Sequence, residues 1–373
     1  MMDLTSRFSF GVNIDASWRF AGVKEPKSII FPHLLSISIP EGRFLDELEE
    51  AEIRAHGDPE PRGGTARASL ALADNLQSAG VDYVRCWFSW LFFEPKPVPA
   101  ASLGELAESG YPEYPLDSFV DSLSAKGIGI IPVLACGYQR MLPEGLSVDA
   151  DPTLYLRRAA VHAKLVVRRY KDRVKNWQIE NEPNWWEMHE TAGWRKGASW
   201  VDSKEFRDDL LKTLNEAVHE EDPSARTIIN LEADKPIKAI NEVAAACDLV
   251  GLDYYPNYRA ADPINLSEFK TASEYSRAIG KPVFIAETGY PSGPSFLGYS
   301  SQKQAQYVEL ALREALATEG INAIGIWRYI DTAWRSFPEQ ENHFGLIDEK
   351  GGPKEAWYRL AHIIKELKGR GAS

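Results

Sequence analysis

The sequence predicts one α/β domain folded as a (β/α)8 barrel, and three observations support that prediction. Eight short apolar runs recur along the 373 residues, and amphipathic stretches of helical periodicity lie between them. The runs are almost continuously apolar, which is typical of parallel strands covered on both faces. No glycine-rich phosphate loop follows the first run, and this disfavours the alternative of an open, doubly wound sheet.

Each predicted strand ends in polar or aromatic residues. The eight strands are expected at 8–14, 81–88, 128–135, 174–180, 226–231, 248–254, 282–287 and 321–327. In a (β/α)8 barrel the carboxyl ends of the strands form one face, and catalytic groups lie on that face and on the loops that leave it. The polar strand ends are therefore the candidate site.

Eight helices are expected between and after these strands. Asp151-Pro152 is a start signal for the third of them, and Gly80 and Gly280 stand where a helix ends and a strand follows. The helices are predicted at 66–79, 115–126, 153–173, 203–220, 236–246, 266–279, 300–319 and 353–368.

The composition disfavours several classes of partner and site. There are 42 Lys and Arg against 54 Asp and Glu, for a formal charge of −12, which argues against nucleic acid and anionic membranes as partners. No apolar run reaches the length of a membrane span. The three cysteines lie too far apart for a disulfide framework or a zinc pattern. The first residues contain no apolar leader, so a cytoplasmic location is expected. The oligomeric state is not determined by the sequence.

The chain is about 120 residues longer than a minimal barrel of about 250 residues. We expect one domain over 1–373, with the surplus on the face that carries the strand carboxyl ends. The enlarged loops are predicted at 16–64, 89–114, 183–202 and 328–352, of which 16–64 after the first strand is the longest. Loops on this face are expected to wall in a substrate site.

Two glutamates follow apolar strands that lie three units apart in the barrel. Glu182 follows the fourth strand and Glu287 ends the seventh. A carboxylate in such a place is unfavourable unless it faces the open mouth of the barrel. Paired carboxylates perform glycoside hydrolysis, with retention when they lie about 5–5.5 Å apart and inversion when they lie farther apart. The sequence does not determine that separation.

The motifs around these glutamates resemble those of the retaining glycoside hydrolases of clan A, the 4/7 superfamily of (β/α)8 barrels. The resemblance covers about 8–368, and no single family is assigned. The motifs are VRCWFSW at 84–90, WQIENEPN at 177–184, GLDYYP at 251–256, IAETGYP at 285–291 and GIWRY at 325–329.

The resemblance implies a role for each charged or amide residue in these motifs. Glu182 is implied as the acid/base and Glu287 as the nucleophile. Asn181 is implied as the residue that binds the sugar 2-hydroxyl, and Arg85 as a cation beside the nucleophile. Glu180 departs from the clan pattern. It is expected either to raise the pKa of Glu182 by like-charge repulsion or to pair with a basic residue inside the barrel.

Aromatic residues at the strand ends are expected to contact sugar. Of Tyr254 and Tyr255, one phenol should reach Glu287 and the other should pack, and we favour Tyr254 for the contact. Trp327 is implied as a stacking platform for a sugar ring. Trp185 and Trp186, in a tryptophan-rich loop after the fourth strand, are expected to line subsites.

Three further residues lie at or just past strand ends. Asn13 and Asp15 end the first strand, and Tyr138 follows the third. Each is predicted to contact a sugar hydroxyl, with the alternative that Asn13 and Asp15 cap the loop that follows.

The sequence therefore predicts a retaining β-glycoside hydrolase that acts on β-linked oligosaccharides, exo or on short chains, without metal or cofactor. An endo-acting β-glycanase on mannan, glucan, galactan or xylan is the alternative. A transglycosylase would share the same residues. An inactive carbohydrate-binding barrel is a remote alternative, because both glutamates and Asn181 are present. A metal-dependent barrel hydrolase is disfavoured because no strand ends in histidine.

Overall fold

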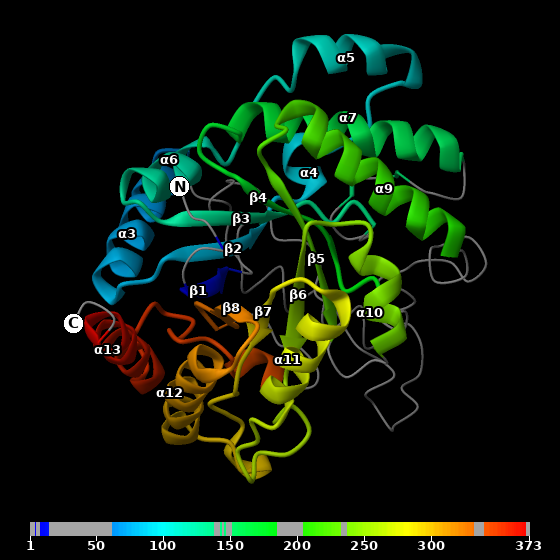
Figure 1. Cartoon of the computed structure of the whole chain (residues 1–373). Coiled ribbons are helices and arrows are strands. Elements are labelled where there is room, and N and C mark those ends of the chain that lie inside the picture. Colours follow the sequence, from blue (N-terminus) through cyan, green and yellow to red (C-terminus); the bar gives the residue numbers. More distant parts are fainter. Residues whose placement is uncertain are drawn as a thin grey trace, which may run out of the picture.

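The computed structural model is a closed barrel of eight parallel strands with helices around its outside (Figure 1). It describes residues 4, 8–14, 62–137, 142–143, 145–146, 151–184, 204–232, 237–331 and 339–370. Neighbouring strands pair in the order of the sequence, from β1 to β8, and β8 closes the barrel against β1. The predicted fold class is confirmed.

All eight predicted strands are present within about three residues of their expected bounds. They are β1 Ser9–Ile14, β2 Tyr83–Trp87, β3 Gly129–Val133, β4 Asn176–Asn181, β5 Arg226–Glu232, β6 Leu249–Tyr254, β7 Val283–Thr288 and β8 Ile321–Ile326. Almost every strand residue is buried, which agrees with their continuous apolar character.

The eight expected helices surround the strands (Figure 1). They are α3 Arg62–Ala79, α6 Asp117–Ala125, α7 Pro152–Tyr170, α9 Lys204–Glu221, α10 Ile237–Ala244, α11 Glu268–Ile279, α12 Ser301–Ala317 and α13 Glu355–Arg370. Within the described ranges, no helix has both the length and the apolarity that a membrane span requires.

Two of the predicted loops differ from expectation. α3 begins at Arg62, so the long first connection ends before residue 64. The predicted loop 89–114 contains short helices: α4 Trp90–Phe93, η2 Ala100–Ser102 and α5 Leu103–Ser109. Apolar residues such as Trp90 and Leu106 are buried there, because the segment packs as part of the core and not as an exposed loop.

The centre of the barrel is filled by side chains from several strands. Tyr83 on β2 is fully buried and packs with Ile131, Ile228 and Phe284 from β3, β5 and β7. A Cβ atom on Gly11 of β1 would lie 2.2 Å from the Tyr83 ring, so only glycine fits opposite this tyrosine. This layer closes the barrel below the strand ends and leaves the polar groups at one mouth.

The Asp151 side chain caps α7 and gives a test of the local helix signal. Its Oδ1 accepts the Leu154 N–H at 2.9 Å, and Pro152 occupies the first turn. Asp151→Ala is expected to lower the free energy of unfolding by about 1 kcal/mol, because an N-terminal N–H loses its acceptor. Urea unfolding measures the change. Thr153→Ala, an exposed change in the same turn, is the control, and equal effects of both variants would contradict the capping role.

Candidate active site

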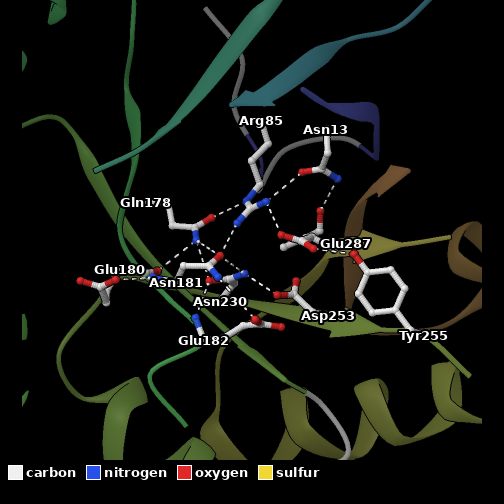
Figure 2. A network of polar contacts seen from close by, with 11 residues as sticks. Asn13, Arg85, Gln178, Glu180, Asn181, Glu182, Asn230, Asp253, Tyr255 and Glu287 are labelled. Carbon is white, nitrogen blue, oxygen red and sulfur yellow. Dashed lines mark hydrogen bonds and ion pairs between the residues drawn. The ribbon is translucent and has the colours of Figure 1, made fainter. Parts of the chain in front are cut away.

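A buried arginine organises the mouth of the barrel. The Arg85 guanidinium, 1% exposed, reaches across from β2 and lies between groups from three other strands (Figure 2). Its Nη1 donates to Glu287 Oε1 at 2.5 Å, and its Nη2 donates to Asn181 Oδ1 at 2.7 Å. Burial opposes its charged form, but the negative charges of Glu287 and Asp253 outweigh burial and raise the Arg85 pKa.

Two amides complete the hydrogen bonds of Arg85. Gln178 Oε1 accepts from Nε at 2.5 Å, and Asn13 Oδ1 accepts from Nη1 at 3.0 Å. Asn13 is 1% exposed, and its Nδ2 donates to the Ala286 carbonyl at 2.9 Å. The structure therefore places Asn13 as a support for Arg85, and its sugar contact stays a prediction. Gln178 was missed, although a glutamine within an apolar strand was a visible signal.

Glu287 is held from two sides at the end of β7. Arg85 binds one carboxylate oxygen, and the Tyr255 hydroxyl donates to the other, Oε2, at 2.5 Å (Figure 2). The Tyr255 ring packs edge-on against Phe344, with ring centroids 5.6 Å apart, so the phenol is fixed in place. Burial and the Glu287 charge raise the Tyr255 pKa well above its usual value, so the hydroxyl stays a donor.

The preference for Tyr254 as the partner of Glu287 is wrong. Tyr254 turns outward from the barrel and stacks on Phe269 of α11, at 6.2 Å between centroids. Its hydroxyl has no hydrogen-bond partner among the described residues. The reason is strand alternation: Asp253 faces the mouth, so Tyr255 also faces it and Tyr254 faces the helix layer.

Glu182 lies opposite Glu287 in an unusual backbone conformation. Its φ is +43°, in the left-handed region that disfavours residues with a side chain. Its N–H meets two acceptors of Asn230 on β5, the carbonyl oxygen and Oδ1, both at 3.1 Å. Glu182 is 7% exposed and Glu287 is 6% exposed, so both carboxyls are nearly buried. Strained residues of this kind cluster at functional sites.

Asn230 connects Asn181 and Glu182 with Asp253, and the sequence did not lead us to expect this residue in the site. Its Nδ2 donates to Asn181 Oδ1 at 2.9 Å and also to Asp253 Oδ2, while its Oδ1 accepts from Gln178 Nε2 at 2.6 Å. Asn181, the predicted contact of the sugar 2-hydroxyl, is oriented by this network, and its Nδ2 lies 3.4 Å from Glu182 Oε2.

Glu182 has the electrostatic environment of a proton donor. Burial and then the negative charges of Glu287 and Glu232 raise its pKa well above the usual range, against opposing effects of Asp253 and Arg85. Asp253 on β6, a third carboxyl in the site, was also missed. Burial and the charges of Glu287 and Glu182 raise the pKa of Asp253 well above its usual range. Within the described residues, no cluster with the composition of a metal site is present.

Glu180 fits neither sequence expectation. The pairing of β4 with β5 shifts register between Gln178 and Glu180, so Glu180 turns away from the other site carboxyls (Figure 2). It accepts the N–H groups of Gly137 at 2.7 Å and Asn181 at 2.9 Å. Burial raises its pKa to about 8, although these two bonds oppose the shift. The charges that raise the Glu182 pKa most are those of Glu287 and Glu232.

Trp327 follows β8 and is half-buried. Its backbone N–H donates to the Thr288 carbonyl at 2.7 Å. The Arg328 guanidinium lies 5.4 Å from the centroid of the Trp327 ring. This position next to the end of β7 is compatible with the predicted platform, which stays a prediction. The remaining predicted contacts, Asp15, Tyr138, Trp185 and Trp186, lie outside the described residues.

No family model matches the sequence. Among curated proteins, the chain is similar to endo-1,4-beta-xylanase B of Thermotoga neapolitana, with 25% identity over 222 residues. That match covers 55% of this chain and 60% of the xylanase, so it spans less than two thirds of the relative.

Solved structures with the same architecture cover most of the chain. A GH5_18 protein of Streptomyces cattleya, in complex with Manb1-4GlcNAc, has a TM-score of 0.65 at 16% identity, covering 96% of this chain and 81% of that one. An exo-beta-1,4-mannosidase from Opitutaceae bacterium strain TAV5 has a TM-score of 0.58 at 17% identity, covering 98% and 61%. A family 39 glycoside hydrolase from Bacteroides cellulosilyticus has a TM-score of 0.58 at 18% identity, covering 80% and 61%.

The chain shares its closed barrel with these solved structures. At these identities the structural likeness establishes the fold alone. By their names, the family 39 neighbour is a glycoside hydrolase, the Opitutaceae neighbour is an exo-mannosidase and the curated relative is a xylanase. The resemblance identified from the sequence motifs is confirmed to that extent.

The raised pKa of Glu180 makes a prediction about stability. The folded protein binds this proton up to about pH 8, whereas the unfolded chain releases it near pH 4.3. The contribution of Glu180 to stability is therefore full below pH 4.3 and is lost as the pH rises to about 8, by about 1.4 kcal/mol per pH unit at most. Glu180→Gln should flatten this part of the profile, measured by urea unfolding across the range.

Glu105→Gln, at an exposed carboxylate of α5, is the control for this experiment. It makes the same chemical change at the surface and is expected to leave the slope as in the unaltered protein. Parallel profiles for the unaltered protein and Glu180→Gln would contradict a buried proton on Glu180.

Proposed function

We propose that the chain is a retaining β-glycosidase in which Glu287 is the nucleophile and Glu182 is the acid/base. The observation that carries the assignment is the asymmetry of their contacts. Glu287 has Arg85 at 2.5 Å and the Tyr255 hydroxyl at 2.5 Å. Glu182 is buried and has negative charges around it, and both raise its pKa. One carboxylate is thus held in place for attack and the other holds a proton to deliver.

The reaction follows in two displacements. A Glu287 oxygen bonds to the anomeric carbon while the bond to the leaving oxygen breaks, and Glu182 gives its proton to that oxygen. Water then attacks the anomeric carbon, Glu182 takes a proton from the water, and the ester bond to Glu287 breaks. Asn181, fixed by Arg85 and Asn230, is placed to donate to the sugar hydroxyl beside the reacting carbon.

We infer that the substrates are short β-linked oligosaccharides cleaved from an end. The names of two structural neighbours support this choice, since one is an exo-beta-1,4-mannosidase and another was crystallised with Manb1-4GlcNAc. β-Mannosides are accordingly the first substrates to test. The xylanase relative favours a second candidate, endo-action on xylan or a similar β-glycan.

A panel of aryl β-glycosides and a pentasaccharide ladder test the substrate class. Steady release of monosaccharide from the ladder supports exo-action, and mixed fragments support the endo-acting candidate. The absence of hydrolysis on every aryl glycoside and polysaccharide of the panel would contradict the proposed function.

Chemical rescue tests the assignment of the two glutamates. Glu287→Gly is expected to lose hydrolysis by 10⁴-fold or more, as an order of magnitude for a lost nucleophile. Azide should restore turnover of an activated aryl β-glycoside and give the α-glycosyl azide. Glu182→Gly with azide should give the β-glycosyl azide instead. The opposite pairing of variants and product anomers would reverse the roles.

Tyr254, the last residue of β6, and Tyr255, which follows it, provide a matched pair. Tyr255→Phe removes a hydrogen bond to Glu287 and is expected to lower kcat/KM by about 10- to 100-fold, the effect of one charge-assisted bond. Tyr254→Phe removes a hydroxyl that points away from the site and should change kcat/KM less than about 3-fold. Equal losses in both variants, measured with the same aryl glycoside, would contradict the placement of Tyr255.

A further inference from the structure

Asp253 is a carboxyl in the site that the two-glutamate reaction leaves without a role. It is 2% exposed, and in the strand register it pairs with Glu232 of β5 and Glu287 of β7. One of its oxygens accepts the Asn230 amide (Figure 2). The other has no hydrogen-bond donor within the described part of the chain. A buried carboxyl with one unsatisfied oxygen requires an explanation.

The neighbour that explains it is Glu182, whose carboxyl lies beside that of Asp253, and Asn230 contacts both residues (Figure 2). The negative charge of each carboxyl acts on the other. Two ionised carboxylates are both acceptors and repel, so they can hydrogen-bond only when one of them carries a proton. A single proton also satisfies the oxygen that no N–H reaches.

The charged groups around Asp253 and Glu182, which we call the pair, do not replace this proton. Glu232 from β5 and Glu287 from β7 add negative charge, and the Tyr255 hydroxyl donates to Glu287. The hydrogen bonds of Arg85 in the described structure go to Glu287, Asn13, Asn181 and Gln178, and not to the pair. The cation is therefore directed at Glu287, and the pair is left with its proton as the neutralising charge.

We propose that Asp253 is a positioning residue that shares one proton with Glu182 and holds it there while Glu287 is ionised. The inference rests on the proposed function, since it concerns the proton that Glu182 donates. Asp253 acts through Glu182 and needs no contact with the substrate.

The shared proton keeps the charge of the three carboxyls constant through the first step. Before the reaction Glu287 carries one negative charge, and the pair carries one negative charge and one proton. When Glu287 becomes an ester its charge disappears, and the pair gives its proton to the leaving oxygen and carries two charges. The doubly charged pair then makes Glu182 a stronger base toward water, because the charge of Asp253 favours uptake of a proton. The negative charge that Glu287 loses when it attacks is thus regained by the pair when it gives up its proton.

Asp253→Asn tests the shared proton. The amide keeps the shape and can accept from Asn230, but it removes a carboxyl. When kcat/KM is plotted against pH, the fall at high pH reports the loss of the last proton from the pair. That loss leaves two adjacent anions. We call this part of the profile its basic limb. In the variant only one anion forms, so the basic limb should move to lower pH by about 1 unit or more. A purely structural role would lower the whole profile and leave the limb in place.

Glu180→Gln is the matched control, since it also replaces a buried carboxyl with an amide near Glu182 but makes its contacts to backbone N–H groups. Its basic limb should stay at the position of the unaltered protein. A basic limb of Asp253→Asn at that same position would overturn the inference, while normal hydrolysis by the unaltered protein would leave the proposed function intact.

A second measurement is independent of substrate. The infrared difference between the unaltered protein and Glu182→Gln at neutral pH should contain a carboxylic-acid carbonyl band, because the variant removes a partner of the shared proton. This measurement also applies if Asp253→Asn does not fold. The absence of that band would overturn the inference, and failure of hydrolysis on the whole panel with the band present would overturn the proposed function alone.

Discussion

The polar mouth of this barrel depends on one buried cation. A guanidinium that is 1% exposed is strongly unfavourable unless its N–H groups find acceptors and its charge finds a counter-charge. Arg85 obtains both from β1, β4 and β7, which are not neighbours in sequence, and so the contacts of one side chain define the arrangement of the strand ends. Any strand that lost its acceptor would leave a buried N–H donor of Arg85 unsatisfied. This explains why the amides of Asn13 and Gln178 occupy fully buried strand positions.

The direction of Arg85 also separates the two glutamates chemically. Because the cation lies against Glu287, its charge is less available to Glu182, whose surroundings are the carboxyls of Glu287, Glu232 and Asp253. Two side chains of the same chemistry thereby have different electrostatic surroundings at one mouth of the barrel. The difference arises from the contacts of the Arg85 guanidinium, which donates to Glu287 and, within the described structure, to no oxygen of Glu182 or Asp253.

The sequence was sufficient for the barrel, its strand bounds and the two glutamates, because continuous apolar runs and polar strand ends are local signals. It was not sufficient for features set by register. The bulge in β4 places Glu180 outside the carboxyl cluster, and no local signal marks that bulge. The inward face of β6 decides between Tyr254 and Tyr255, and it could have been inferred from Asp253, a polar residue that must face the mouth. Asn230 and Gln178 were visible as polar residues in apolar strands, but their partners depend on the closed barrel.

Asn230 shows how the closed barrel reaches the chemistry. The left-handed backbone at Glu182 is unfavourable by about 1–2 kcal/mol for a residue with a Cβ atom. It persists because both acceptors of Asn230 receive the Glu182 N–H, while the Asn230 amide also binds Asn181 and Asp253. One residue of β5 therefore sets the backbone of Glu182, the orientation of the neighbouring Asn181 and the position of Asp253. The alignment of β4, β5 and β6 is thus a condition for the placement of Glu182 and Asp253, as the ion pair between β2 and β7 is for the placement of Glu287.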